Sequence, residues 1–285
     1  MRPHFYEHEA VGRWGCCAPV AFQSGRYRAA CRLFRVPLFA DRRGSGAMRS
    51  QAASDWWSVQ GEWAEAPNAR RGGFSGVQRV VLRESGDCFY VKKQRNHVFR
   101  SLRYPSGRPT LLREWLSLRA CARIGVPTPP VEFFDMHKAK DGWHAVLVTR
   151  GLQGYVSLKE GFGDRGWTAA QRIEALRAVA QALVSLHLAR RKHGHLYPKE
   201  IFVDLSTSPP AVAFVDWEMS RKCLTPAQAA GSDVRRLLKS LCALGATTEE
   251  IEILLAEYRA RGIALRLPAG LAQVASRSGV PIPRQ

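Results

Sequence analysis

The sequence predicts an α+β protein in which a small β-rich lobe is followed by a larger helical lobe. One observation is that short apolar runs, separated by polar turn residues, recur through residues 77–148. Another is that apolar residues recur at helical spacing through much of residues 168–258. A pair of short apolar strands interrupts this helical half at residues 201–218, which makes the order of the elements specific.

The first half is expected to contain four strands and one helix. The predicted strands are residues 77–82, 88–91, 131–134 and 145–148. A polar turn separates the two members of each pair, as in antiparallel hairpins. The predicted helix covers residues 110–124, because its apolar residues fall on one face and Gly125, followed by Pro127, ends it.

The second half is expected to be mainly helical. Thr168 can cap a long helix, whose apolar residues recur at helical spacing up to Leu183. The further predicted elements are a loop at 193–200, strands at 201–205 and 211–218, a helix from Pro226 and a helix over 251–258. A β-rich lobe followed by a helical lobe with one inserted hairpin is the order of elements in the protein-kinase fold.

The net charge of +19 is the unusual feature of the composition. Such an excess of positive charge favours a polyanionic partner, which is a nucleic acid, an anionic membrane surface or a phosphorylated substrate. The alternative is that a GC-rich genome encodes arginine in place of lysine on solvated surfaces. Charge alone does not decide between the two. Nucleic acid is not expected, because the sequence contains no recognised nucleic-acid-binding motif.

The cysteines indicate a reducing compartment, and the hydropathy bears on whether the chain could span a membrane. The seven cysteines are odd in number and contain no Cys-x-x-Cys pair, which disfavours a disulfide framework or a structural zinc site. The chain has no run of about 18 apolar residues, the length that a membrane-spanning helix needs. A cytoplasmic location is therefore expected, with peripheral contact at the anionic inner membrane as a further possibility.

Residues 1–47 differ in composition from the rest. They contain eight arginines, no lysine and three acidic residues, without a sustained helical or strand period. One hypothesis is a disordered basic arm, and the other is a start codon assigned too far upstream, with Met48 as the true first residue. The second is favoured, because the segment has neither a core-forming pattern nor low complexity. The expected division is then 48–150 for the β-rich lobe and 151–285 for the helical lobe.

Two segments of the β-rich lobe could bind nucleotide phosphates. Gly72, Gly73 and Gly76 precede and enter a strand, where backbone amides without side chains can approach phosphates closely. A flexible turn is the simpler explanation of these glycines. Lys92 ends an apolar strand and could neutralise phosphates, with Lys93 as its rival because a strand turns only one of the two inward. An ordinary strand-end lysine with its charge in water is the alternative.

Two carboxylates complete the pattern. Glu114 lies in the first turns of the predicted helix, where it could pair with that lysine rather than with solvent. Asp216 follows the apolar run 211–215, and a carboxylate there suits Mg²⁺, which takes oxygen ligands. An aspartate after a strand is usually a turn residue, but here it follows the other three signals in the order found in kinases.

Seven segments together resemble the lipopolysaccharide kinase InaA family, within the protein-kinase-like superfamily that includes heptose and Kdo kinases of the lipopolysaccharide core. The segments are RRGGFSGVQR (70–79), YVKKQRNH (90–97), YPSGRPTLLREW (104–115), GVPTPPVEFF (125–134), HGHLYPKEIFV (193–203), FVDWEMSRK (214–222) and SDVRRLLKSL (232–241). They extend over roughly residues 68–245, which is most of the chain after Met48.

The resemblance implies a bilobal protein-kinase-like fold that binds ATP and Mg²⁺. In chain order, the implied roles are a phosphate-covering loop (Gly72, Gly73 and Gly76), the nucleotide lysine (Lys92), its carboxylate partner (Glu114), a hinge facing adenine (residues 149–152), a magnesium-binding aspartate (Asp216) and a brace for the catalytic loop (Asp233).

The catalytic loop departs from that of an active kinase at two positions. A kinase loop begins His-Arg-Asp, and its Asp accepts the proton of the acceptor hydroxyl. Here the triplet is His193-Gly194-His195, and Glu200 stands where Asn, or His in sugar-phosphorylating relatives, is usual. His195 could serve as the general base and Glu200 could bind Mg²⁺. Equally, both substitutions could be neutral drift in a protein that binds nucleotide without transferring phosphate.

The leading functional hypothesis is an ATP- and Mg²⁺-dependent phosphotransferase that acts on a sugar hydroxyl of the lipopolysaccharide core. The basic surface agrees with such an anionic substrate, and with possible peripheral contact to anionic lipid of the inner membrane. In this hypothesis Lys92 and Asp216 bind nucleotide and metal, and His195 orients or deprotonates the acceptor. The alternative is a pseudokinase that binds nucleotide or a partner without phosphoryl transfer.

Overall fold

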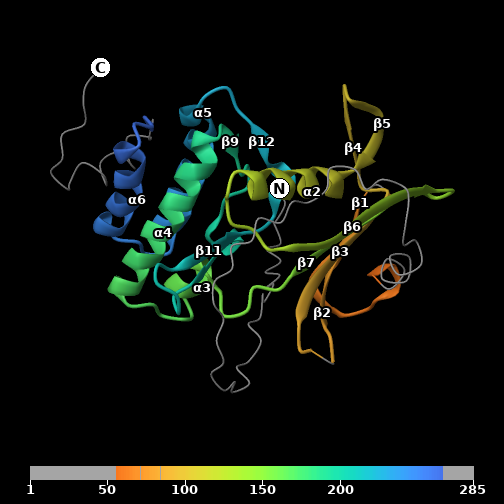
Figure 1. Cartoon of the computed structure of the whole chain (residues 1–285), viewed down its shortest axis with the longest axis horizontal. Helices are drawn as coiled ribbons and strands as arrows, with labels where there is room; N and C mark the ends of the chain where they lie inside the picture. Colours follow the sequence, from red (N-terminus) through yellow and green to blue (C-terminus); the bar gives the residue numbers. More distant parts are fainter. Residues whose placement is uncertain (1–55, 71, 84, 266–285) are drawn as a thin grey trace, which may run out of the picture.

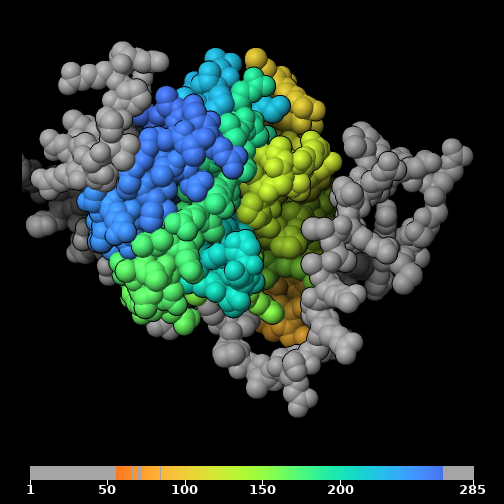
Figure 2. All heavy atoms as spheres, turned by 60° about the vertical axis from the view of Figure 1, so that its left-hand side comes forward, coloured from red at the N-terminus to blue at the C-terminus, as the bar shows by residue number. Residues whose placement is uncertain are grey.

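The computed structural model describes residues 56–70, 72–83 and 85–265, and it confirms the predicted α+β class. The expectation for residues 1–47 lies outside the described residues. An antiparallel sheet forms one side of the molecule, and four helices gather on the other side (Figure 1). Figure 2 shows the two parts packed against each other.

The main sheet has five strands in the order β1-β2-β3-β7-β6. The strands are β1 (Glu62–Arg70), β2 (Gly73–Val81), β3 (Cys88–Arg95), β6 (Val131–Ala139) and β7 (Gly142–Arg150). Every neighbouring pair is antiparallel. In the pair of β3 with β7, Lys92 lies opposite Leu147. The strands are longer than their apolar runs, because polar residues such as Lys138 still pair across the β6–β7 hairpin.

Between β3 and the first long helix lies a hairpin that the sequence did not indicate. It consists of β4 (Val98–Ser101) and β5 (Tyr104–Pro109), and it projects away from the main sheet after the end of β3 (Figure 1). Its residues include three arginines, two prolines and one glycine, which carry little strand signal. The helix α2 (Thr110–Arg123) follows at once, as predicted, and buries Leu111, Leu118 and Cys121.

The helical part contains α3 (Leu158–Phe162), α4 (Ala169–Leu188), α5 (Pro226–Ala243) and α6 (Thr248–Ala260). Thr168 caps α4 as predicted, because its side chain accepts a hydrogen bond from the Gln171 amide and Gln171 bonds back to it. Leu176 and Leu183 of α4 are completely buried. A continuous apolar core runs from α2 and β7 into α4, α5 and α6, so the sheet and the helices share it.

Short strands connect the two parts. They form a three-stranded sheet in the order β11-β10-β8 and a separate β9–β12 pair. Their bounds are β8 (Val156–Ser157), β9 (Arg191–Lys192), β10 (Ile201–Asp204), β11 (Ala211–Phe214) and β12 (Arg221–Lys222), with the 3-10 helices η1 (Pro198–Glu200) and η2 (Trp217–Met219) between them. None of the helices in the described part of the chain has the length and apolar character needed to cross a membrane.

The strand predicted over residues 211–218 was wrong at its end. It stops at Phe214, and Asp216 takes a left-handed backbone conformation with φ of 61° that begins η2. The cause is Trp217, whose indole Nε1–H donates to the Phe214 carbonyl at 2.8 Å and whose side chain is fully buried. Because this tryptophan folds back under the strand, the chain cannot continue in extended form.

Candidate active site

A cleft lies between the main sheet and the β10–β11 hairpin. Its wall on the sheet side includes Val77 of β2 and Leu147 of β7, and Phe202 of β10 faces them from the other side. Thr149, Arg150 and Leu152 of the predicted hinge also line the cleft, as do the polar residues Lys92, Glu114, Lys199, Glu200 and Asp216. Apolar walls with a few converging charged groups are typical of a small-molecule site.

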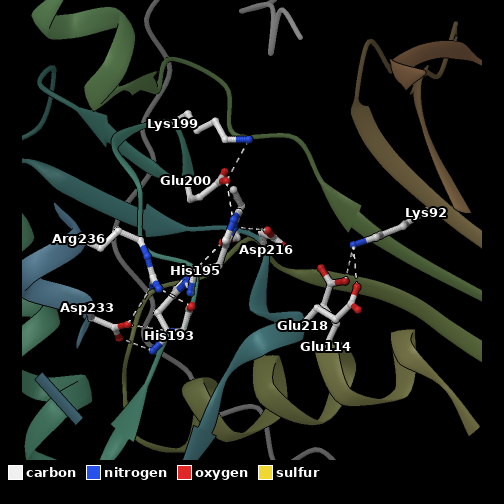
Figure 3. Close-up of polar contacts among 12 residues, drawn as sticks. Lys92, Glu114, His193, His195, Lys199, Glu200, Asp216, Glu218, Asp233 and Arg236 are labelled. Atoms are coloured by element: carbon white, nitrogen blue, oxygen red, sulfur yellow. Dashed lines mark hydrogen bonds and ion pairs between the residues drawn. The ribbon is translucent and has the colours of Figure 1, made fainter. Parts of the chain in front are cut away.

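Lys92, rather than Lys93, turns toward this cleft. Its Nζ lies 2.8 Å from Oε2 of Glu114 and 4.0 Å from Oε2 of Glu218 (Figure 3). Burial would lower the pKa of Lys92, but Glu114 and Asp216 outweigh burial and raise it above its ordinary value, so the ammonium stays charged. Lys93 points to the opposite face, where its Nζ donates to the carbonyls of Trp57 and Val59 at 2.9 and 2.6 Å.

His195, Glu200 and Asp216 form a compact cluster, of which Glu200 and Asp216 line the cleft. The Nδ1 atom of His195 lies 2.8 Å from Oδ2 of Asp216 and 3.5 Å from Oε1 of Glu200 (Figure 3). One potential ligand atom from each of the three residues lies within 4.8 Å of the others. They come from the catalytic loop, from the end of η1 and from the turn before η2, so three segments converge on one point.

The surroundings move the pKa values of this cluster in different directions. Burial raises the pKa of Glu200 to about 7, because the carboxyl group is almost fully removed from water. Burial also opposes ionisation of Asp216, but the hydrogen bond with His195 and the charge of Lys92 lower its pKa below the ordinary value. The same hydrogen bond raises the pKa of His195.

Asp233 fixes the backbone at the start of the predicted catalytic loop. This fully buried side chain accepts hydrogen bonds from the backbone N–H groups of His193 and Gly194, at 2.6 and 3.0 Å. The loop is tied further by Arg236, whose Nη1 donates to the Gly194 carbonyl at 2.8 Å (Figure 3). His193 itself is buried and its Nε2 lies 2.8 Å from the Val215 carbonyl oxygen, which links the loop to the segment that carries Asp216.

The three predicted glycines lie on the β1–β2 hairpin but not in the described lining of the cleft. Gly72 is exposed in the turn with φ of 74°, a conformation that favours glycine. Gly76 lies within β2, where an added Cβ would approach the ring of Trp63 to 2.6 Å, so its local role is packing. The hairpin reaches the described cleft wall through Glu65 and Val77 instead.

Several residues of the site were missed by sequence reasoning. Glu218 adds a second carboxylate near Lys92, and its position two residues after Asp216 could have drawn attention to it. Lys199 lies 3.3 Å from Glu200 and could have been considered because the two are adjacent. Glu65 had no signal, because the segment around it shows no clear period in the sequence.

The cluster has the donor set that a hard divalent cation requires. Glu200 and Asp216 offer carboxylate oxygens, and Mg²⁺ is bound in proteins mainly by carboxylates together with substrate phosphates. The burial that keeps Glu200 close to neutral in the protein alone would be offset by a bound cation, which favours the ionised carboxylate. The residues present therefore fit a magnesium ion.

Comparisons with known proteins give a family model, a relative and a solved structure with the same fold. The family model described as "Lipopolysaccharide kinase (Kdo/WaaP) family" matches residues 54–258. Protein InaA of Escherichia coli strain K12 is 37% identical over 189 residues, which cover 65% of this chain and 86% of that protein. A solved structure of WaaP in complex with acyl carrier protein matches with a TM-score of 0.55 at 20% identity, over 72% of this chain and 80% of that one. At that identity the match shows a shared fold.

Proposed function

We propose that this chain, which belongs to the lipopolysaccharide kinase (Kdo/WaaP) family, transfers a phosphoryl group from ATP to a hydroxyl group of a lipopolysaccharide core sugar. The observation that carries the proposal is that Lys92, Glu200 and Asp216 line one cleft, with His195 in contact with both Glu200 and Asp216. The proposal includes a bilobal, protein-kinase-like arrangement in which residues 48–150 and 151–285 form the two lobes.

The nucleotide would occupy the cleft with its base against the hinge at residues 149–152. Lys92 is then placed to neutralise the phosphates, and Glu114 holds the ammonium in position through the 2.8 Å ion pair. The glycines Gly72, Gly73 and Gly76 would act indirectly, by letting the β1–β2 hairpin turn and pack over the phosphates.

Glu200 and Asp216 would hold the magnesium ion. When bound, Mg²⁺ neutralises charge on the transferring phosphate. Oδ2 of Asp216 is occupied by His195, so Oδ1 is the oxygen left for a cation. Asp233 contributes by fixing the backbone of residues 193 and 194, which positions His195 beside Glu200 and Asp216.

His195 is proposed as the group that orients or deprotonates the acceptor hydroxyl. With its Nδ1–H donating to Asp216 at 2.8 Å, the ring presents Nε2 as a free proton acceptor. The carboxylate also raises the pKa of the imidazole, which makes Nε2 a better base. This pairing would let a histidine serve where a kinase loop ordinarily has an aspartate.

The second candidate function is a pseudokinase that binds nucleotide without transferring phosphate. The observation in its favour is that both usual catalytic-loop residues are replaced, by His195 and Glu200. The Asp216–His195 hydrogen bond supports it as well, since it occupies one carboxylate oxygen that a metal could use.

The test is phosphate transfer from ATP to purified core oligosaccharide, followed by mass spectrometry. Asp216→Ala should abolish transfer, because it removes a metal ligand and the partner of His195. Asp164→Ala, an exposed aspartate in the loop before α4, is the matched control and should transfer as well as the wild type. Equal transfer by Asp216→Ala would show the site assignment to be wrong, whereas nucleotide binding without any transfer by the wild type would support the pseudokinase.

The net charge of +19 accords with an anionic acceptor. Such an acceptor lies at the cytoplasmic side of the inner membrane in this proposal, so peripheral contact with anionic lipid is part of it. A nucleic-acid partner is not proposed.

A further inference from the structure

We propose that one face of this protein docks on the surface of an anionic lipid bilayer. The face, called here the basic face, consists of the β4–β5 hairpin (residues 98–109), the β9 segment (189–192) and the β12 segment with the start of α5 (219–232). The inference names the surface for the lipid contact that the proposed function includes, but it does not require that phosphoryl transfer occurs.

The segments of the basic face carry positive charge and no acidic residue of their own. Its exposed cations are Arg100, Arg103, Arg190, Arg221 and Lys222. The three segments contain no aspartate or glutamate in their sequence. In the β9–β12 part a hollow is lined by four of the basic residues and by no acidic residue of the described chain. Cations within a Debye length of an anionic bilayer are each attracted to it.

Apolar side chains project from the same segments. Leu102, at the tip of the β4–β5 hairpin, is 104% exposed, and Leu224, before α5, is 82% exposed. Met219, which ends η2 just before β12, is half exposed. Each leucine stands one or two residues from a cation, namely Arg103 and Lys222. Exposed large apolar groups beside cations are typical of proteins that insert side chains shallowly into a headgroup layer.

The segments lie at one end of the molecule. Figures 1 and 2 both show the β4–β5 hairpin and the connection from β12 to α5 at the same end. The contacts explain this, because α2 begins at Thr110 directly after β5 and packs along η2, which ends two residues before β12. A bilayer surface at this end would meet both the hairpin that carries Leu102 and the connection that carries Leu224.

A lipid surface fits these features better than a nucleic acid does. Binding of single-stranded nucleic acid relies on aromatic rings on which bases can stack. The tyrosine of the hairpin, Tyr104, is already covered by its own arginines, with Arg103 and Arg108 lying 5.5 and 5.4 Å from the ring centre. The groups left for a partner are cations and aliphatic side chains.

Docking on this face would bring the catalytic loop close to the bilayer. Lys192 of β9 directly precedes His193, and Arg221 of β12 follows η2, which begins one residue after Asp216. A membrane-bound acceptor would then meet the cleft without leaving the bilayer surface, so the position of the basic face accords with the proposed substrate.

Vesicle co-sedimentation of the full chain, without nucleotide or acceptor, tests the proposal. The wild type should bind vesicles of phosphatidylcholine mixed with phosphatidylglycerol and leave pure phosphatidylcholine vesicles unbound. Leu102→Ser and Leu224→Ser should each weaken binding about tenfold, because the buried aliphatic area is lost. Arg221→Gln and Lys222→Gln should each weaken it about fivefold. Circular dichroism should show unchanged melting temperatures, since all four side chains are exposed.

The matched controls come from the turn between β2 and β3, at the other end of β3 from the hairpin. Leu82→Ser removes a leucine that is 39% exposed, Arg83→Gln removes an exposed cation, and both variants should bind as the wild type does. Asp216→Ala should also bind normally, which separates this proposal from the catalytic one.

Three results would overturn the inference. The first is a wild type that does not bind the anionic vesicles, and the second is binding by the four basic-face variants that equals that of the wild type. The third is binding that depends on the cations but is indifferent to both leucines, and that soluble heparin abolishes. That last result would make the face a general polyanion site instead of a bilayer-docking surface.

Discussion

His195, Glu200 and Asp216 contact one another in a single polar network. The imidazole bridges the two carboxylates, at 2.8 Å from Asp216 and 3.5 Å from Glu200, and Lys199 lies against Glu200 at 3.3 Å. Burial and the Asp216 charge oppose ionisation of the Glu200 carboxyl, whereas Lys199 and His195 favour the ionised carboxylate. Such a network is consistent with a working arrangement of groups, and its chemistry can be tested one residue at a time.

His195→Asn separates orientation from proton transfer. The asparagine amide can still donate to Asp216, but the variant has no Nε2 to accept a proton. If His195 is the base, kcat for sugar phosphorylation should fall by roughly 10²- to 10⁴-fold while ATP affinity stays unchanged. His144→Asn, on β7 away from the cleft, is the control. Wild-type kcat in His195→Asn would mean that the histidine only orients Asp216.

Asp233→Asn should change how stability depends on pH. Burial would raise the pKa of Asp233, but hydrogen bonds and charges from His187 and His193 and the Gly194 amide lower it below the ordinary value, and Arg236 lies 3.9 Å away. The ionised carboxylate therefore stabilises the fold above about pH 4, and this contribution is lost as the pH falls through the lowered pKa.

Denaturant unfolding from pH 7 down to pH 3 measures this effect. At pH 7 the asparagine variant should be less stable by about 2 to 4 kcal/mol, because hydrogen bonds to a buried charged group are lost. The difference from the wild type should shrink in acid, as the wild-type aspartate becomes protonated. A difference that stays constant over the whole range would contradict the assignment of this acid dependence to Asp233.

Among the structural elements, the catalytic loop and η2 behave as one packed unit. The His193 ring lies over the buried Trp217, with ring centres 4.5 Å apart, and its Nε2 contacts the Val215 carbonyl. Gly194, the next residue, has φ of 89° and no room for a side chain, since an added Cβ would collide with the Met219 carbonyl oxygen. A loop shift would therefore move the segment that carries Asp216.

Gly194→Ala should disrupt this unit. The positive φ costs an alanine about 1 to 2 kcal/mol, and the collision with backbone adds to that strain. We expect a lower melting temperature and loss of phosphate transfer. Gly231→Ala is the matched control, because Gly231 lies within α5 with open space around its Cα. That variant should be more stable than the wild type by about 0.4 to 1 kcal/mol, and equal behaviour of the two variants would contradict the strain argument.

For the molecule as a whole, the cleft draws its charged groups from both parts of the fold. Lys92 and Glu114 come from the sheet and α2, whereas Glu200 ends η1, Asp216 precedes η2, and their neighbour His195 lies in the loop before η1. A nucleotide with its metal would touch both sets. Ligand binding should therefore stabilise the sheet and the helical part together, even though they already share a core.

Thermal unfolding with ATP, with and without Mg²⁺, measures this coupling for a kinase and a pseudokinase alike. ATP and Mg²⁺ at about 100 times the dissociation constant should add about 2.7 kcal/mol of stability. Lys92→Met should lose most of that shift relative to its own ligand-free melting temperature. Lys93→Met should keep it, because Lys93 contacts backbone carbonyls on the opposite face of the sheet. No shift in the wild type would contradict nucleotide binding.

The sequence by itself determined the class of the fold and the order of most elements. The helices at 110–123 and 169–188 could be predicted because caps, breakers and apolar periodicity are local signals. The same order of elements, with Lys92, Glu114, His195, Glu200 and Asp216 spaced along it, indicated which side chains to consider together. The β4–β5 hairpin was missed because its residues carry weak strand propensity, and its pairing depends on contacts with each other.

Only the tertiary structure decided how these side chains face one another. The register of β3 against β7 turns Lys92 toward Glu114 and Lys93 away, and the burial of Trp217 bends the chain so that Asp216 meets His195. Pairing within the β1–β2 hairpin likewise decided which of its residues reach the cleft. Glu65 and Val77 line the described cleft wall, and the three glycines do not. Pairing register, burial and chain reversal arise from contacts between residues distant in sequence, which local patterns do not contain.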